Sequence, residues 1–131
     1  MSKIVKFVCA TDDGINFSKK HFGSAKKYLL YSLDIETGFI KYIKEINNTT
    51  PEERIHGDPK KAKSISQMLN NVQILIGAAF GPNIVRMRKK YVIVVSREPN
   101  IKKSLEKINT ILEDIKLSLD QIGDKKIIYL R

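Results

Sequence analysis

Apolar and polar residues follow one another in blocks along the chain, and the blocks show two different periods. Continuous apolar runs bounded by polar turn residues are typical of buried strands, whereas apolar residues that recur every three or four positions are typical of helices packed on a sheet. The first pattern predicts strands over residues 3–10, 28–35, 39–46, 72–77 and 91–96, with a short terminal strand over residues 126–130. The second pattern predicts helices over residues 60–70, 82–90 and 101–122.

Turn residues mark several ends of these predicted elements. Glu36, Thr37 and Gly38 separate the second and third strands, which predicts a hairpin turn with the glycine in the left-handed conformation. Pro82 stands at the first position of a short helix, where its missing N–H costs nothing. Gly123 ends the long helix predicted over residues 101–122.

The order of the elements predicts an α/β fold. Three strands that pair antiparallel at the start, followed by strand–helix units, give a mixed sheet with helices on its faces. At 131 residues the chain is expected to be a single domain, residues 1–131, large enough to bury a core. Residues 106–131 are the end of the long helix and the terminal strand.

Composition narrows the class of protein. The single cysteine, Cys9, allows no intrachain disulfide and no site built from several thiolates of this chain, and its place in the first strand favours core packing. The longest apolar stretch, residues 72–80, is too short to cross a membrane, and no signal region precedes the first strand. We therefore expect a cytoplasmic protein without a membrane segment.

The formal net charge of +10 indicates an anionic partner or a lysine-rich solubilising surface. The positive excess is largest at residues 60–63 and 86–90. Nucleic acid, a phosphate ligand and an anionic metal–sulfur cluster would all be attracted to such a surface. Because lysines occur in every part of the chain, solubility alone explains the charge equally well.

Two loops combine glycine with the chain's two histidines. Asp12, Asp13 and Gly14 directly follow the first strand, and His21, Phe22 and Gly23 come soon afterwards. His56 and Gly57 lie in a polar loop between residues 47 and 59. Because buried strands place functional groups at their carboxyl ends, the first of these groups is expected at one edge of the sheet.

These residues carry a family resemblance. Asp12-Asp13-Gly14, His21-Phe22-Gly23, His56-Gly57 and a later segment that includes Gly81-Pro82 occur in the order found in the dinitrogenase iron–molybdenum cofactor biosynthesis family, which the chain resembles over residues 3–105. The resemblance implies a ribonuclease-H-like fold and a site, formed by these four groups, for an iron–sulfur or iron–molybdenum-type cluster. It implies an accessory protein that exchanges the cluster with donor and acceptor proteins and is not an enzyme.

His21 and His56 are the metal ligands that the resemblance implies, since neutral imidazole suits iron. Two ligands are too few for a closed site, so the rest would come from the sulfides of the cluster, a second subunit, or Asp12 and Asp13. The alternative is that both histidines only make hydrogen bonds within their loops. The chain also departs from the family pattern after His56, where Asp58 and Pro59 stand in place of a further histidine or glycine.

Other interpretations of the same residues remain open at this stage. Asp12 and Asp13 could belong to a two-metal nuclease, but such chemistry needs further convergent carboxylates, and a turn with aspartate capping is the simpler interpretation. The glycines of residues 77–83 could let an anion approach a helix N-terminus, or could form a plain turn. Basic and aromatic residues on the predicted hairpin, with the net charge, make nucleic-acid binding the main alternative function.

Overall fold

The computed structural model describes residues 3–49 and 59–131, with the side chains of residues 59–62 left aside. The strands are β1 (Ile4–Thr11), β2 (Lys27–Asp34), β3 (Ile40–Asn47), β4 (Ile74–Gly77), β5 (Val92–Ser96) and β6 (Ile128–Leu130). The α-helices are α1 (Pro59–Met68), α2 (Ile84–Met87), α3 (Ile101–Leu105) and α4 (Leu112–Asp120). Two 3-10 helices, η1 (Phe22–Ser24) and η2 (Ile108–Ile111), complete the described elements.

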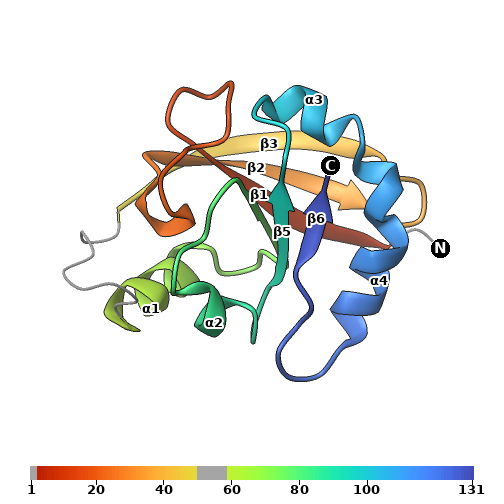
Figure 1. Cartoon of the computed structure of the whole chain (residues 1–131). Coiled ribbons are helices and arrows are strands. Elements are labelled where there is room, and N and C mark those ends of the chain that lie inside the picture. Colours follow the sequence, from red (N-terminus) through yellow and green to blue (C-terminus); the bar gives the residue numbers. More distant parts are fainter. Residues whose placement is uncertain (1–2, 50–58) are drawn as a thin grey trace.

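The strands form one mixed sheet in the order β3-β2-β1-β4-β5-β6 (Figure 1). β2 runs antiparallel to both β1 and β3, whereas β4 is parallel to β1, β5 to β4 and β6 to β5. The predicted α/β class, the antiparallel start and the terminal strand are therefore confirmed. The ribonuclease-H-like assignment stays a prediction.

Helices cover both faces of the sheet because successive strand residues point to opposite sides. Phe7 of β1 belongs to the core cluster that includes Ile115 of α4. Its neighbour Val8 belongs to the cluster on the other face, with Ile65 of α1 and Met87 of α2. The continuous apolar runs of the central strands follow from this burial on two faces.

The hairpin between β2 and β3 has the predicted turn. Gly38 has a φ of +81°, and its N–H donates to the carbonyl of Asp34 at 2.7 Å. The Asp34 carboxylate also accepts from the N–H of Glu36 at 2.9 Å. The left-handed backbone explains the need for glycine at this position.

The structure contradicts the prediction of one long helix over residues 101–122. Helix α3 ends at Leu105, residues 106 and 107 form a turn, η2 follows as a 3-10 helix, and α4 ends at Asp120. Ile108 and Ile111, three positions apart, satisfy the period of a 3-10 helix as well as that of an α-helix, so the apolar pattern could not show the break. Among the described residues, no helix is long and apolar enough to span a membrane.

The predicted helix over residues 82–90 is also shorter than expected. Only Ile84–Met87 is α-helical, and the chain then closes through turns in which the N–H groups of Lys89 and Lys90 donate to the carbonyls of Arg86 and Met87. These three-residue steps tighten the chain before it enters β5. The positive end of a long helix dipole is therefore absent from this loop.

Candidate functional site

The loops that follow β1, β4 and β5 leave the sheet at one edge, because these three strands are parallel. We call this the carboxyl edge; it carries residues 12–26, 78–83 and 97–100 (Figure 1). The first and third loops are joined, since the Phe17 N–H donates to the Pro99 carbonyl and the Ile101 N–H to the Ile15 carbonyl. Asp12, Asp13, Gly14, His21 and Gly81 are thus brought to the same edge, as the sequence predicts.

Asp13 caps the turn in which it lies. Its Oδ1 accepts hydrogen bonds from the N–H groups of Ile15 and Asn16, both at 2.8 Å. Gly14 closes the turn with a φ of +82° and donates its N–H to Thr11 Oγ1 at 2.9 Å. The backbone donors at Asn16 and then Ile15 hold the pKa of Asp13 below its usual range, since they favour the charged form.

This lowered pKa predicts how acid weakens the turn. A carboxylate whose pKa is lower in the folded state adds stability above its unfolded pKa, about 3.9 for aspartate, and that stability is lost as the pH falls through the folded value. We expect the carboxyl carbon of Asp13 to titrate below the ordinary aspartate value in an NMR experiment. The variant Asp13→Asn should reduce the dependence of stability on pH in this acid range. A midpoint at or above the ordinary value would contradict the capping role.

Asp12 holds the loop after the turn. Its Oδ1 accepts from the N–H of Lys26 at 2.9 Å, and its Oδ2 accepts from the hydroxyl of Ser18 at 3.0 Å. Lys20 Nζ lies 3.8 Å from Oδ2 at a partly exposed position. Both carboxylates of the loop therefore position backbone and side-chain groups of the loop itself, and they do not converge on a common point as a two-metal site requires.

His21 packs directly on Gly81, which connects the first loop to the second. A Cβ at position 81 would lie only 2.6 Å from Cγ and 2.7 Å from Cε1 of the half-buried His21 ring. Gly81 also has a φ of +69°, a conformation that residues with a side chain rarely adopt. Gly81 is thus required twice, by its backbone and by the imidazole that lies against it.

Replacing Gly81 by alanine should displace the His21 ring and destabilise the fold by more than the about 1–2 kcal/mol that a left-handed residue with a Cβ usually costs. Gly123 provides a matched control, because it has a φ of +86° but nothing within 4 Å of an added Cβ. We expect Gly123→Ala to show the backbone cost alone, with unchanged NMR signals of the His21 ring. Equal ring signals in the two variants would show that the contact between His21 and Gly81 is not formed.

Phe22, the residue after His21, belongs to a buried aromatic group. Phe22 is fully buried and stacks on Phe80, with ring centroids 5.0 Å apart and planes at 6°. A Cβ on Gly77 would lie 3.2 Å from Phe22, so this glycine lets the ring approach the end of β4. The hydroxyl of the buried Tyr28 donates to the Phe22 carbonyl at 2.7 Å. The side chain of Phe22 therefore anchors η1 in the core and faces away from the carboxyl edge.

The neighbouring polar groups fix the backbone of the same loop. Asn48 Nδ2 donates to the carbonyls of Gly23 and Ala25 at 2.9 and 2.7 Å. Pro82 follows Gly81 in the second loop, and Asn83 after it is buried. Gly23 and Pro82 thus shape the two loops through their backbone. Helix α2 follows the second loop, but with four residues it is too short to supply a strong dipole there.

The second histidine group, His56 and Gly57, lies outside the described residues. Within the described part of the chain, no group of three or more histidine, cysteine, aspartate or glutamate side chains is placed to hold a metal ion. The described site thus offers one imidazole, and a complete metal cage is not formed by residues 3–49 and 59–131.

Comparison of the sequence with models of protein families shows to which family the chain belongs. The sequence model described as dinitrogenase iron-molybdenum cofactor matches residues 3–111, which is more than half of the chain. The chain belongs to this family. The match begins where the resemblance seen in the sequence begins and continues slightly further, to the end of η2. Comparison with curated proteins and comparison with solved structures each found no match.

Membership of the dinitrogenase iron–molybdenum cofactor family does not make Cys9 a ligand. Its side chain is fully buried in the cluster of the core that α4 covers, and burial raises the pKa of the thiol well above its usual value. A thiol that stays protonated is a poor metal ligand. The core-packing interpretation of Cys9 agrees with this environment.

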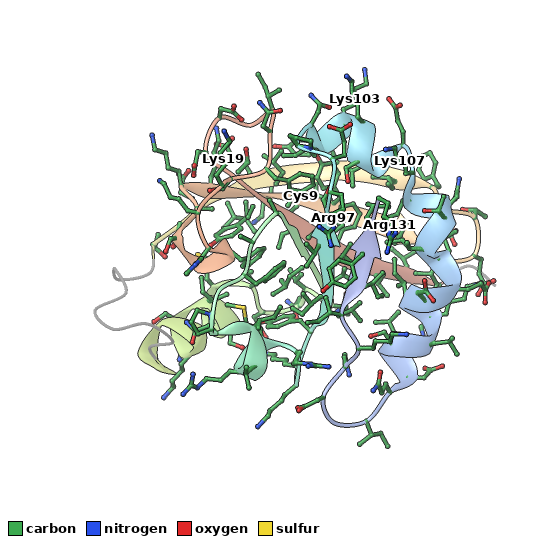
Figure 2. All side chains as sticks on the ribbon, viewed as in Figure 1. Cys9, Lys19, Arg97, Lys103, Lys107 and Arg131 are labelled. Atoms are coloured by element: carbon green, nitrogen blue, oxygen red, sulfur yellow. The ribbon has the colours of Figure 1, made fainter. Side chains whose placement is uncertain are left out.

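Exposed cations around the carboxyl edge form a feature of this family member that the sequence patterns did not reveal. Figure 2 shows their side chains, which come from the first loop, from the ends of β5 and β6, and from the segment around α3: Lys19, Arg97, Lys103, Lys107 and Arg131. Arg97 and Arg131 become neighbours only through the parallel pairing of β5 and β6, so no sequence window could show them together. The net charge was the one available signal.

Proposed function

We propose that the protein binds an iron–sulfur or molybdenum-containing cluster as cargo and passes it between donor and acceptor proteins. The proposal rests on one observation above all: the His21 imidazole is held against Gly81 at the carboxyl edge, in a chain that belongs to the iron–molybdenum cofactor family. Neutral imidazole is a good ligand for iron.

A cluster needs few protein ligands because it brings its own sulfides. His21 would supply one bond, and His56, which lies outside the described residues, would supply the second. Asp12 and Asp13 take part by shaping the loop, since their oxygens already accept hydrogen bonds from Lys26, Ser18, Ile15 and Asn16. Cargo held by one or two imidazoles can be released, as a carrier requires.

The charge of the edge supports an anionic cargo. Lys19 and Lys20 follow the aspartate turn in the same loop as His21, and Lys20 retains a half-exposed side chain beside Asp12. Cations near the cargo would lower the cost of bringing a negatively charged metal–sulfur cluster to the protein. A reducing cytoplasm, which the proposal also takes as the location, would protect such a cargo from oxidation.

The proposed role contains no catalytic step. A two-metal nuclease would place carboxylates on both sides of the metal pair, and here Asp12 and Asp13 are directed into separate hydrogen-bond networks. Binding and release of a cargo account for the His21 imidazole, for Gly14 and Gly81 in the loops, and for the exposed cations of the carboxyl edge.

The direct test is an anaerobic titration of the full chain with a synthetic iron–sulfur cluster and, separately, with thiomolybdate. Absorbance is recorded during the titration, and metal content is measured after desalting. The proposal expects stoichiometric retention of at least one of the two probes. Metal that is removed completely on the desalting column for both probes would contradict it.

Nucleic-acid binding is the second candidate, and the exposed cations Arg97, Lys103, Lys107 and Arg131 are the observation that favours it. Of the aromatic residues on the hairpin, Tyr28 is fully buried and cannot stack on a base, whereas Tyr42 and Phe39 are exposed. Binding to phosphates releases counterions, so affinity for a single-stranded oligonucleotide should fall steeply with salt. The same affinity at low and moderate salt would exclude this candidate.

A further inference from the structure

The outer edge of β6 is open in the part of the sheet that the structure describes. β6 is the last strand of the sheet order, and it pairs with β5. The Arg97 N–H donates to the Leu130 carbonyl at 2.8 Å, so the backbone groups of Leu130 face β5. Because these groups alternate along a strand in a parallel sheet, the N–H and C=O of Tyr129 face the opposite edge. They are available to pair with another strand.

A groove runs beside this open edge. Its lining residues come from α4 and from β6 with the segment before it, which lie side by side in Figure 1. Its volume is about 310 Å³, and we call it the α4–β6 groove. Its lining includes Asp114, Leu117 and Ser118 on α4, and Lys126, Tyr129 and Arg131 on the β6 side. Leu117 is 72% exposed, so the helix side of the groove presents an apolar side chain.

Ser118 is a buried residue of the groove lining with a polar side chain. Its side chain is 3% exposed, and its Oγ has no hydrogen-bond partner among the described residues. Buried hydroxyl groups are nearly always hydrogen-bonded, because an unmade bond in the interior costs free energy. This one lines the groove, where an inserted polar group would satisfy it.

The charged side chains around β6 indicate which kind of segment could bind there. The Arg97 guanidinium lies 5.1 Å from the centre of the Tyr129 ring. Lys126, which precedes β6, and Arg131, which follows it, are both exposed. Asp114 is the acidic residue among the lining residues, and it lies on the helix side. An extended segment along β6 would therefore place every second side chain against α4 and the alternate ones beside these cations.

We propose that an extended, acidic segment of a partner protein adds to β6 as a further strand, with small apolar or hydroxyl side chains in the α4–β6 groove and acidic side chains beside Arg97 and Arg131. Main-chain hydrogen bonds to Tyr129 give the affinity, and the groove and the cations give the specificity. All residues of the groove come after residue 111, where the family match ends. The groove therefore lies outside the residues that the family model matches.

The test uses the full chain and a synthetic peptide in which glutamate alternates with valine, with threonine at the central apolar position. Amide exchange of the isotope-labelled protein is followed by NMR. We expect exchange of the Tyr129 N–H to slow by about tenfold or more at saturation, with little change at Leu130, whose backbone already pairs with β5. Saturable binding without protection of Tyr129 would overturn the proposal. So would protection of Tyr129 in the free protein that increases with protein concentration, because the occupant would then be a second copy.

Variants separate this mode from general attraction to a positive protein. Arg131→Glu should weaken peptide binding by about tenfold, the effect of one lost charge-assisted contact. Lys41→Glu, on the opposite edge strand β3, makes the same change of net charge and should have little effect. Equal losses in the two variants would overturn the proposal.

The variant Ser118→Ala tests the groove in a second way, because stability and peptide affinity are not expected to fall together. Removing an unsatisfied buried hydroxyl should leave the free protein at least as stable as the unaltered chain, while the threonine-containing peptide binds more weakly. A merely structural role of Ser118 predicts the reverse, with a loss of stability and unchanged peptide affinity. That result would overturn the part assigned to the groove.

Discussion

Replacing Phe22 by alanine is expected to lower the free energy of unfolding by about 3–5 kcal/mol, the usual cost of removing a buried phenylalanine side chain. Phe22 is fully buried, stacks on Phe80 and contacts Tyr28 with ring centroids 5.0 Å apart. The cavity would open where η1 meets the end of β4, since Gly77 has no side chain to fill it. Denaturant unfolding followed by circular dichroism measures the change.

Phe39 supplies the control for this prediction. It is 68% exposed in the loop before β3, so Phe39→Ala should change the free energy of unfolding by less than about 1 kcal/mol. If Phe22→Ala lowers the free energy of unfolding by less than about 1 kcal/mol as well, the aromatic stack does not anchor the loop that carries His21.

Replacing His21 by alanine is the second change with a large expected effect. It removes the imidazole proposed to bind the cluster, and affinity should fall at least tenfold, because even the loss of an outer contact to a metal ligand costs between ten- and a hundredfold. Fold stability should change little, since the ring is half-buried at the surface edge. Metal content after desalting and the thermal midpoint are measured on the same samples.

Two other variants test whether the position of His21 matters. Gly81→Ala keeps the imidazole but displaces it, so cluster retention should also fall. Lys41→Ala removes a cation near the opposite end of the sheet, where Lys41 pairs with Ser32 and Ser32 with Lys6, so retention should remain close to that of the unaltered chain. Equal retention in the His21→Ala variant and in the unaltered chain would remove this residue from the site, and in that case His56 becomes the ligand to test.

The sequence predicts the strands well, because each central strand is apolar throughout and the Gly38 turn has a specific backbone requirement. It fails at the long helix, where Ile108 and Ile111 fit two kinds of helix equally. The break follows from packing on the sheet: Ser104 of α3 is tied to Ser96 of β5 by a 2.7 Å hydroxyl contact, which no local pattern contains.

The sequence names the residues of the candidate site but does not reveal their contacts. The resemblance names His21 and Gly81, but their packing depends on the parallel pairing of β1 with β4, which brings the two loops together. Phe22 belongs to the same motif, yet its side chain is in the core, because a His-Phe-Gly sequence does not reveal which side chain points inward. The α4–β6 groove has no signal in the sequence beyond a serine on the face of α4 that also carries Ile115.

The central claim is that a histidine of this chain binds the cluster directly, and pulsed electron paramagnetic resonance tests it most directly. The full chain, with histidine alone labelled with the heavy nitrogen isotope, is loaded with a paramagnetic iron–sulfur cluster. Since the chain has two histidines, the His56→Ala variant isolates the signal of His21. The account predicts a hyperfine coupling from labelled nitrogen in the unaltered chain that persists in this variant. A cluster retained in stoichiometric amount without any coupling to histidine nitrogen would contradict it.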